Sequence, residues 1–465
     1  MLWVWKQSLG QSEWVLRLPS VLATSTAAAL ITLGLYRLRG SLWGGTMAGV
    51  LLAVETNSIF YGTELRPFGI VILLATIACW LAMRPAVRND RGTLLIVVLA
   101  MASAAMQPTS IGVFGWLLAA RCVFTHSRAA HDQSMGERSE RLPSGFALRR
   151  LSSGWEPLVI FLVLVISVIW LGGDVLRSAW QHRSQWQQMG QAYSLLQLWQ
   201  AWPWGALVLL PALLALGTRS YAHWVRSGRS VARADAARPG MPWWALAFSA
   251  LAAVFTFWLV SALGIAPIFH RRYFVACLPL LAWAGGDAMS AAIHQLSEMQ
   301  WSRPRRIGAA WLMAATPVVW LLFAQGTAAR LSAFDLPLVR RGEGWREAVA
   351  YLHRHADPDA TAFVSSGLIE TARLLKMPPA ESPVDAQWYL TYPLQGPYRW
   401  PEARAFDHTD PTGNVALPVI LRANRAAAER WIARSEKILS EHSTNIRSFG
   451  GVQVIENRSA NLTNP

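Results

Sequence analysis

Residues 42–81 read LWGGTMAGVLLAVETNSIFYGTELRPFGIVILLATIACWL, in which two apolar stretches flank the polar segment 61–69. Each apolar stretch approaches the ~20 residues that a helix needs to cross ~30 Å of hydrocarbon. The sequence therefore predicts two membrane-spanning helices, with Glu64 and Arg66 between them at the membrane surface. Both side chains can reach water there at little cost, so a capped loop with a surface ion pair is one interpretation of them.

The composition of the whole chain extends this prediction. Of its 465 residues, 53% are hydrophobic and 15% are charged, whereas soluble proteins average about 25% charged residues. We therefore expect an all-α polytopic membrane bundle of about ten transmembrane helices, followed by a small extracytoplasmic α/β domain. The expected spans are 20–36, 42–60, 67–83, 93–106, 110–124, 157–172, 203–217, 242–264, 273–292 and 307–325.

The arginines predict how these spans are oriented. Most arginines between the spans fall in one set of alternate loops, and the other set holds Arg66, Arg177, Arg183, Arg271 and Arg272. The positive-inside rule places the arginine-rich set in the cytoplasm. Because the number of spans is even, both ends of the chain are then expected on the extracytoplasmic side of the inner (cytoplasmic) membrane.

The chain divides into three expected parts. These are a stretch at the membrane surface, 1–19, a transmembrane domain, 20–326, and an extracytoplasmic domain, 327–465. In the last part, apolar spacing and short apolar runs predict an amphipathic helix at 344–356, strands within 360–366, 415–421 and 450–456, helices within 366–375 and 426–439, and an extended loop at 377–412. Strands that alternate with helices indicate a small α/β layer.

Several kinds of site are disfavoured. The net charge of +15 would suggest nucleic acid in a soluble chain, but the basic residues lie mostly between apolar spans and form no nucleic-acid module, so no nucleic-acid partner is expected.

The cysteines and histidines do not indicate a disulfide or a metal site. Cys79, Cys122 and Cys277 lie in apolar spans without CxxC spacing, which indicates buried hydrophobic side chains rather than disulfides or zinc ligands. His353 and His355 face different sides of a helix, so no metal site is expected there. No cofactor is evident, and a need for a divalent metal stays open.

Charged and aromatic residues lie at several span ends on the extracytoplasmic side. The candidates for binding a lipid phosphate are Arg17, Tyr61, Glu64, Arg66, Arg271, Arg272 and Tyr273. A guanidinium offers a planar fork of donors that matches phosphate oxygens and stays charged, and lipid headgroups rest at this level. Glu64 would orient Arg66 or contact a sugar hydroxyl, and Asp174 marks another span end. Anchoring of each arginine at the membrane surface is the alternative interpretation.

The order of these motifs resembles a known family. The segments LRLPSVLA (16–23), YRLRG (36–40) and LLAVETNSIFYGTELRPFGIVILLA (51–75) are similar to membrane glycosyltransferases with the GT-C fold. The resemblance is to the protein mannosyltransferases that use dolichyl-phosphate mannose and to the aminoarabinose transferases of lipid A. Glu64-Leu65-Arg66-Pro67-Phe68 matches the acidic-x-Arg-Pro-aromatic loop of those enzymes. HRRYFVACLPLLAWAGG (270–286) resembles their late Arg-Tyr element, and GWREAVAYL (344–352) resembles the start of their C-terminal domain.

The resemblance implies a reaction at the outer face of the membrane. A sugar would pass with inversion from a polyprenyl-phosphate donor to an acceptor, while a carboxylate takes the acceptor proton and arginines stabilise the departing phosphate. The expected partners are therefore the lipid bilayer and a polyprenyl-phosphate-linked sugar.

The start of the sequence departs from the family pattern. In the family a further helix and a loop with the catalytic aspartate come before the first of these motifs. This sequence begins MLWVWKQSLGQSEW, which resembles the end of that loop, so we expect an N-terminally truncated form or a non-catalytic relative. Glu64 is a weak candidate for the catalytic base, because a structural role as partner of Arg66 is favoured over a role as base.

A transporter or flippase of lipid-linked sugars is the rival from another class. Transporters place charges in the middle of their spans, and we expect the span interiors here to be almost free of charge apart from Glu55.

Overall fold

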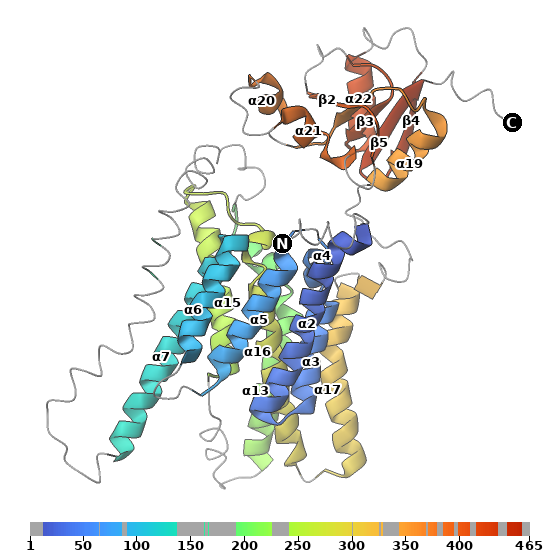
Figure 1. Cartoon of the computed structure of the whole chain (residues 1–465). Helices are drawn as coiled ribbons and strands as arrows, with labels where there is room; N and C mark the ends of the chain where they lie inside the picture. Colours follow the sequence, from blue (N-terminus) through green and yellow to red (C-terminus); the bar gives the residue numbers. More distant parts are fainter. Residues whose placement is uncertain are drawn as a thin grey trace. The chain divides into compact units, whose positions relative to one another are not determined.

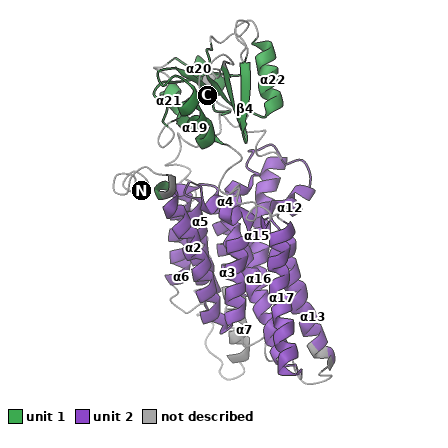
Figure 2. Cartoon of the chain, turned by 90° about the vertical axis from the view of Figure 1, so that its right-hand side faces the viewer, with its two compact units in different colours: residues 1–16, 335–465 green, residues 17–334 purple. Residues whose placement is uncertain are grey.

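The computed structural model describes most of the chain. The described residues are 13–64, 66–85, 91–136, 192–225, 241–299, 301–324, 327–328, 344–368, 371–378, 385–394, 399–409, 415–435 and 444–457, with Leu162 and Ile166. The chain forms two compact units, one of residues 17–334 and one of residues 335–465 together with residues 1–16 (Figure 2). The expected domain boundary at residue 326 and the expected span 157–172 lie outside the described residues, apart from Leu162 and Ile166 in the span.

The larger unit is a helix bundle (Figure 1). Its helices are α2 (Glu13–Arg39), α3 (Leu42–Val54), α4 (Thr56–Gly62), α5 (Phe68–Met83), α6 (Arg91–Met106), α7 (Ser110–Gly136), α12 (Leu196–Ala201), the π-helix η3 (Gly205–Leu209), α13 (Leu210–Val225), α15 (Trp243–Ala262), the 3-10 helix η4 (Arg271–Phe274), α16 (Cys277–Ser297) and α17 (Arg303–Ala324). A helix lies at every expected span that falls within the described residues.

Helix α16 forms the centre of this bundle. Almost every residue from Cys277 to Ala292 is buried, and α16 packs against α3, α5, α13, α15 and α17. Small residues permit this close packing. A Cβ atom on Gly44 would lie 2.5 Å from Ser290 Cβ, and one on Gly286 would overlap Ala48. Small residues at helix contacts let backbones approach closely, as they do inside membranes.

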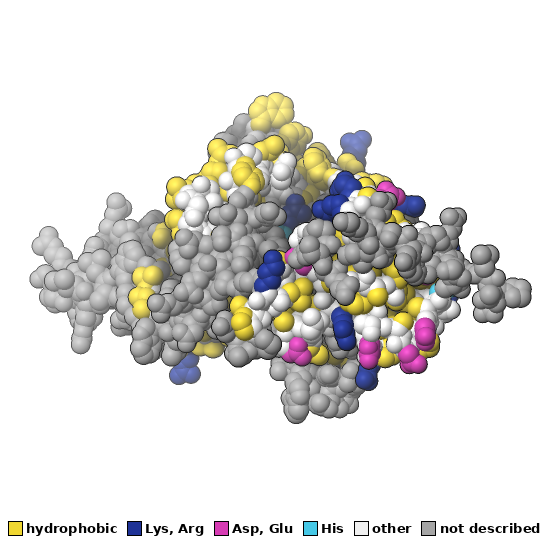
Figure 3. Space-filling view, turned by 90° about the horizontal axis from the view of Figure 1, so that it is seen from above, with side chains coloured by type: hydrophobic (Ala, Val, Ile, Leu, Met, Phe, Trp, Pro, Cys, Tyr) yellow, Lys and Arg dark blue, Asp and Glu magenta, His cyan; other side chains and the backbone are white. Residues whose placement is uncertain are grey.

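The outer surface of the bundle suits a membrane. Val15–Arg39, Trp243–Ala262 and Arg303–Ala324 are each long and apolar enough to cross a bilayer, and shorter apolar helices accompany them. Large apolar side chains are exposed on these helices, among them Leu33, Phe248 and Phe323. Figure 3 shows the face seen from above, where hydrophobic side chains lie among Lys, Arg, Asp and Glu. The chain is therefore a mostly helical membrane protein, although the expected count of about ten spans is not confirmed.

Two expectations about the spans are wrong. The expected span 42–60 is interrupted at Glu55, where α3 ends and α4 begins. The span interiors also hold more charge than Glu55, because Arg121 and Asp287 lie within helices and are buried. Asp287 accepts two hydrogen bonds from Arg39, from Nε at 2.9 Å and Nη2 at 2.8 Å. Arg121 donates to the carbonyls of Leu81 and Ala82 at the end of α5, at 2.7 and 2.6 Å. Each buried charge thus has a local structural role.

The smaller unit contains a five-stranded sheet with the order β2-β1-β3-β5-β4. Its elements are α19 (Trp345–His355), β1 (Ala362–Ser365), α20 (Thr371–Lys376), α21 (Ala386–Leu390), the 3-10 helix η5 (Tyr392–Leu394), β2 (Ala403–Ala405), β3 (Val419–Arg422), α22 (Arg425–Arg434), β4 (Thr444–Phe449) and β5 (Val452–Asn457). Strand β1 is parallel to β2 and β3, and β5 is antiparallel to β3 and β4. The expected α/β layer is present.

Alternating residues of the strands pack on opposite faces of this sheet. Ile420 on β3 belongs to a cluster with Trp345 and Val349 of α19. Its neighbours Val419 and Leu421 belong to a cluster with Trp431 of α22. This period of two is what a sheet covered on both faces requires. The expected extended loop 377–412 is wrong in part, because α21, η5 and β2 lie within it.

Candidate functional site

The candidate site lies at the end of the bundle that carries α4 (Figure 1). Glu55 ends α3 and caps α4, and so determines where α4 begins. Its backbone is extended, and its carboxylate accepts hydrogen bonds from the Ser58 amide at 2.6 Å and from Asn57 Nδ2 at 2.7 Å. An acidic side chain at this position satisfies amides that a helix start leaves without partners. The fully buried Glu55 thus directs α4 into the polar segment 61–69.

The start of α2 packs against that polar segment. Arg17 Nη1 donates to the Thr63 carbonyl at 3.3 Å, and Ser20 Oγ donates to the Arg66 carbonyl at 3.1 Å. A Cβ atom on Gly69 would lie 2.5 Å from the Ser20 carbonyl oxygen, so glycine is needed for this approach. The two family-like motifs around residues 17–20 and 63–69 are therefore in direct contact.

The side chains of the polar segment differ in exposure. Tyr61 and Glu64 are buried, whereas the Arg66 side chain is exposed. The Tyr61 ring contacts Phe60 and Phe68 edge to face, each with 5.1 Å between ring centroids. The Phe68 of the Glu-x-Arg-Pro-Phe motif therefore serves to position Tyr61.

The second half of the site is the turn that precedes α16. His270 Nδ1 accepts a hydrogen bond from the Arg272 amide at 3.3 Å and so caps η4. Arg272 Nη2 donates to the Tyr273 hydroxyl at 2.8 Å, and the guanidinium carbon lies 4.7 Å from the centre of the Tyr273 ring. Arg271 Nη2 donates to the Gln200 carbonyl at 2.6 Å, and its side chain is otherwise exposed. A guanidinium has five N–H donors, so this bond leaves Arg271 donors for a ligand.

The turn between α6 and α7 supports these arginines. Gln107 Nε2 donates to the Arg272 carbonyl at 3.4 Å, and Thr109 Oγ1 donates to the Tyr273 carbonyl at 2.9 Å. The sequence separated the expected spans 93–106 and 110–124 at this turn but did not assign the turn to the site. The available signal was the pair of polar side chains around Pro108 between two apolar spans.

Electrostatic interactions join the two halves of the site. Burial raises the pKa of Tyr61 above its ordinary value, and the carboxylate of Glu64 raises it further. The charges of Arg271 and Arg272 act on the Tyr61 hydroxyl in the opposite direction. Tyr61 is therefore a protonated hydrogen-bond donor at neutral pH. The structure thus brings Tyr61, Glu64, Arg271 and Arg272 within electrostatic range of one another.

His270 is uncharged in this setting. Burial lowers its pKa to about 4, and the charges of Arg272 and Arg271 contribute to the decrease. A neutral imidazole can accept the hydrogen bond that caps η4, whereas an imidazolium cannot. The positive charge of this turn therefore resides on the two arginines.

The remaining site predictions have separate outcomes. Arg17 donates a hydrogen bond to the polar segment. Arg66 belongs to this segment and accepts a hydrogen bond from Ser20 through its backbone carbonyl, while its side chain is exposed. Asp174, Arg177 and Arg183 lie outside the described residues. His353 and His355 contact different aromatic rings, of Trp400 and Tyr351. Within the described ranges no three His, Cys, Asp or Glu side chains lie together as metal ligands.

Comparison with known proteins gives little further information. No family model matches the chain, and no curated protein matches it. A search of solved structures finds a crystal structure of ArnT from Cupriavidus metallidurans bound to undecaprenyl phosphate. The sequence identity is 14% and the TM-score is 0.45, over 100% of this chain and 87% of that chain.

Proposed function

We propose that this chain is an integral-membrane glycosyltransferase-like protein that binds the phosphate of a polyprenyl-phosphate-linked sugar. The observation that supports this most directly is the turn before α16, where Arg271 is exposed and held by the Gln200 carbonyl at 2.6 Å and Arg272 is held by the Tyr273 hydroxyl at 2.8 Å. The charges of both arginines act on Tyr61. These residues belong to the motifs that resemble the GT-C family. Each guanidinium can donate two parallel hydrogen bonds to a phosphate.

In the proposed reaction, the bond between the sugar C1 and the phosphate oxygen breaks. A bond from an acceptor hydroxyl oxygen to C1 forms on the opposite face of the sugar. The electron pair of the broken bond leaves with the phosphate, and Arg271 and Arg272 stabilise the added negative charge. The protonated Tyr61 hydroxyl supplies a further donor close to these arginines.

The acceptor proton passes to a carboxylate base in this reaction. We assign Glu64 the role of orienting Tyr61 rather than that of the base, because it is buried and its charge acts on the Tyr61 hydroxyl. Transfer therefore requires a carboxylate other than Glu64, whereas binding of the lipid phosphate requires only the residues described here.

Binding and transfer should be measured separately on the full chain in lipid nanodiscs. Arg271→Ala and Arg272→Ala should each weaken binding of a polyprenyl phosphate about tenfold or more, since a charged hydrogen bond contributes ~1.5–3 kcal/mol. Arg271→Lys should lie between Arg271→Ala and the wild type, because it keeps the charge but loses the planar fork. Arg91→Ala is the matched control, because Arg91 is exposed at the first residue of α6.

Unchanged binding by both alanine variants would remove the phosphate-binding role. Transfer of a sugar from its polyprenyl phosphate, lost in the same variants, would support the enzyme. Arginine-dependent binding without any transfer would favour the non-catalytic relative.

A further inference from the structure

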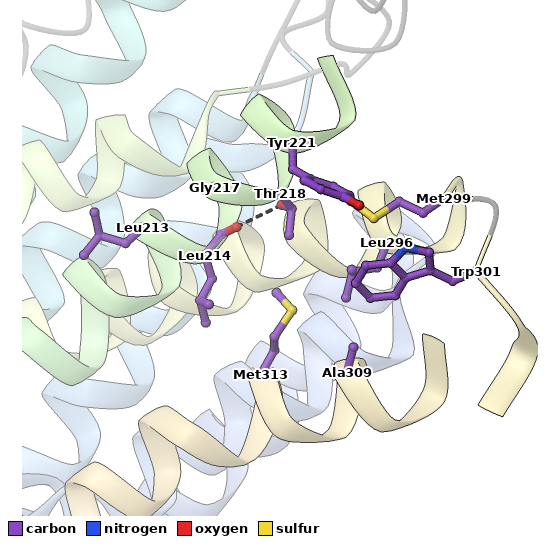
Figure 4. A pocket seen from close by; sticks show the side chains of 10 residues that line it. All are labelled: Leu213, Leu214, Gly217, Thr218, Tyr221, Leu296, Met299, Trp301, Ala309 and Met313. Atoms are coloured by element: carbon purple, nitrogen blue, oxygen red, sulfur yellow. Dashed lines mark hydrogen bonds between the residues drawn. The ribbon is translucent and has the colours of Figure 1, made fainter. Parts of the chain in front are cut away.

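A second feature of the bundle lies at the end opposite α4, where α13, α16 and α17 meet. A pocket of about 390 Å³ opens there between the three helices (Figure 4). Leu214 and Tyr221 of α13, Leu296 of α16, and Ala309 and Met313 of α17 line it. This pocket is separate from the candidate site, which belongs to the other end of the helices (Figure 1).

The lining suits an apolar occupant. Its polar member Thr218 already donates to the Leu214 carbonyl at 2.9 Å, drawn in Figure 4, and lies 2.6 Å from Gln295 Oε1. The other side chains named above are aliphatic or aromatic. Burial of an apolar chain in such a groove is favourable by ~25 cal/mol for each Å² removed from water.

A cluster of positive charge borders the pocket. Arg303, Arg305 and Arg306 occupy the first turn of α17, which has no acidic residue. The amino end of a helix itself carries partial positive charge, so cations there are unfavourable until an anion is bound. Arg305, Ala309 and Met313 follow one another at intervals of four residues, which places them along one face of α17. The basic end of this face therefore continues directly into the lining of the pocket.

The arginines of this turn divide into two groups. Arg306 Nη1 donates to the Ser297 carbonyl at 2.9 Å and so holds α17 to the end of α16. Arg303 and Arg305 have exposed side chains. Arg305 lies on the face that lines the pocket and is available to bind a ligand, whereas Arg306 maintains the turn and Arg303, two residues from Arg305, faces another side of the helix.

We propose that this pocket binds one acyl chain of an anionic phospholipid, whose phosphate contacts Arg305. An apolar groove that ends at an exposed guanidinium group matches a molecule with an apolar tail and an anionic head. Topology alone accounts for arginines at this end of a membrane protein, but it does not require an apolar pocket beside them. A substitution that fills the pocket distinguishes lipid binding from topology, because it blocks the pocket and leaves every arginine in place.

Gly217 offers a way to fill the pocket. It lines the pocket on α13, and no atom lies within 4 Å of a Cβ atom built on it. Gly217→Leu should therefore occupy the pocket without displacing the backbone. Gly308→Leu is the matched control, because Gly308 lies on α17, is equally open to a new side chain and is not part of the lining. Both changes remove a helical glycine, so they raise helix propensity alike.

The experiment is native mass spectrometry of the full chain released from nanodiscs that contain equal amounts of phosphatidylglycerol and phosphatidylcholine. The wild type and Gly308→Leu should retain phosphatidylglycerol in preference. Gly217→Leu should lose most retention of both lipids. Arg305→Ser should reduce the preference about fivefold, because an arginine near an anionic lipid contributes ~1 kcal/mol, whereas Arg303→Ser should change it little.

Equal retention of the two lipids by the wild type would overturn the proposal. An equal loss of retention in Gly308→Leu and Gly217→Leu would also overturn it. A dimer of the wild type that Gly217→Leu dissociates would identify a second copy of the chain, rather than a lipid, as the occupant. Loss of retention in Gly217→Leu alone, with normal binding of polyprenyl phosphate at the other end, would support a separate lipid site.

Discussion

Replacing Asp287 with asparagine should destabilise the helix bundle by about 3 kcal/mol. The Asp287 carboxylate accepts hydrogen bonds from both Nε and Nη2 of Arg39, at 2.9 and 2.8 Å. The two side chains are only 3% and 8% exposed. The substitution keeps the shape of the side chain but leaves a buried guanidinium without its negative partner, a change that costs about 3–5 kcal/mol. The lower value applies because Arg39 Nη2 also donates to the Met241 carbonyl at 3.2 Å.

Thermal unfolding of the purified chain in detergent measures this change. A loss of about 3 kcal/mol corresponds to a decrease of roughly 4–5 °C in Tm, because the entropy of unfolding is ~2.1 cal/mol/K per residue and the unit spans residues 17–334. Glu298→Gln is the matched control at the end of the same helix. Glu298 lies 3.6 Å from His294 in a largely exposed pair, so its change should stay within ~0.5 kcal/mol. The reasoning is refuted if the two substitutions shift Tm equally.

Two further predictions concern other buried polar groups of the bundle. Arg121→Met should lower the free energy of unfolding by about 2 kcal/mol, because the last carbonyls of α5 lose a buried charged donor, and Arg91→Met should leave Tm nearly unchanged as the exposed control. His270 has an ordinary pKa of 6.5 and a folded pKa of about 4, so between these values the unfolded chain binds a proton that the folded chain does not. Stability should therefore be full above pH 6.5 and decrease as the pH falls toward 4. His270→Gln should lose less Tm than the wild type between pH 7 and pH 4.5, and an equal loss would show that His270 does not cause the decrease.

Apolar runs predicted the helices of the bundle well, because a long hydrophobic segment has few other structures available to it. The helices α5 and α15 lie within about two residues of the expected spans. The interruption at Glu55 was not predictable. A single acidic residue in an apolar run can cap a helix or pair with a distant residue, and the local sequence is the same in both cases. Asp287 was missed because its partner Arg39 is 248 positions away along the chain.

In the smaller unit, the missed strands lack the usual sequence signals. Strand β2 has only three residues and depends on parallel pairing with β1. Strand β4, TNIRSF, is mostly polar on both faces and depends on its antiparallel partner β5. Such strands are determined by pairing with distant residues, which the local sequence does not show.

The sequence identified the candidate residues of the site through their motifs but not their arrangement. It placed Glu64 and Arg271 on the same side of the membrane, which the distribution of arginines could indicate. It could not show that the charges of Glu64 and Arg271 both act on Tyr61, or that Gln107 and Thr109 hold the arginine turn, because those interactions depend on how the helices pack.

The position of β5 has a consequence for how the smaller unit is made. Strand β5, Val452–Asn457, lies between β3 and β4 in the interior of the sheet rather than at its edge. During synthesis, β3 therefore cannot pair with β5 along its full length until residue 457 has left the ribosome. Until then the apolar edge of β3 is open to other chains, so pairing with β5 both extends the sheet and protects the nascent protein from aggregation.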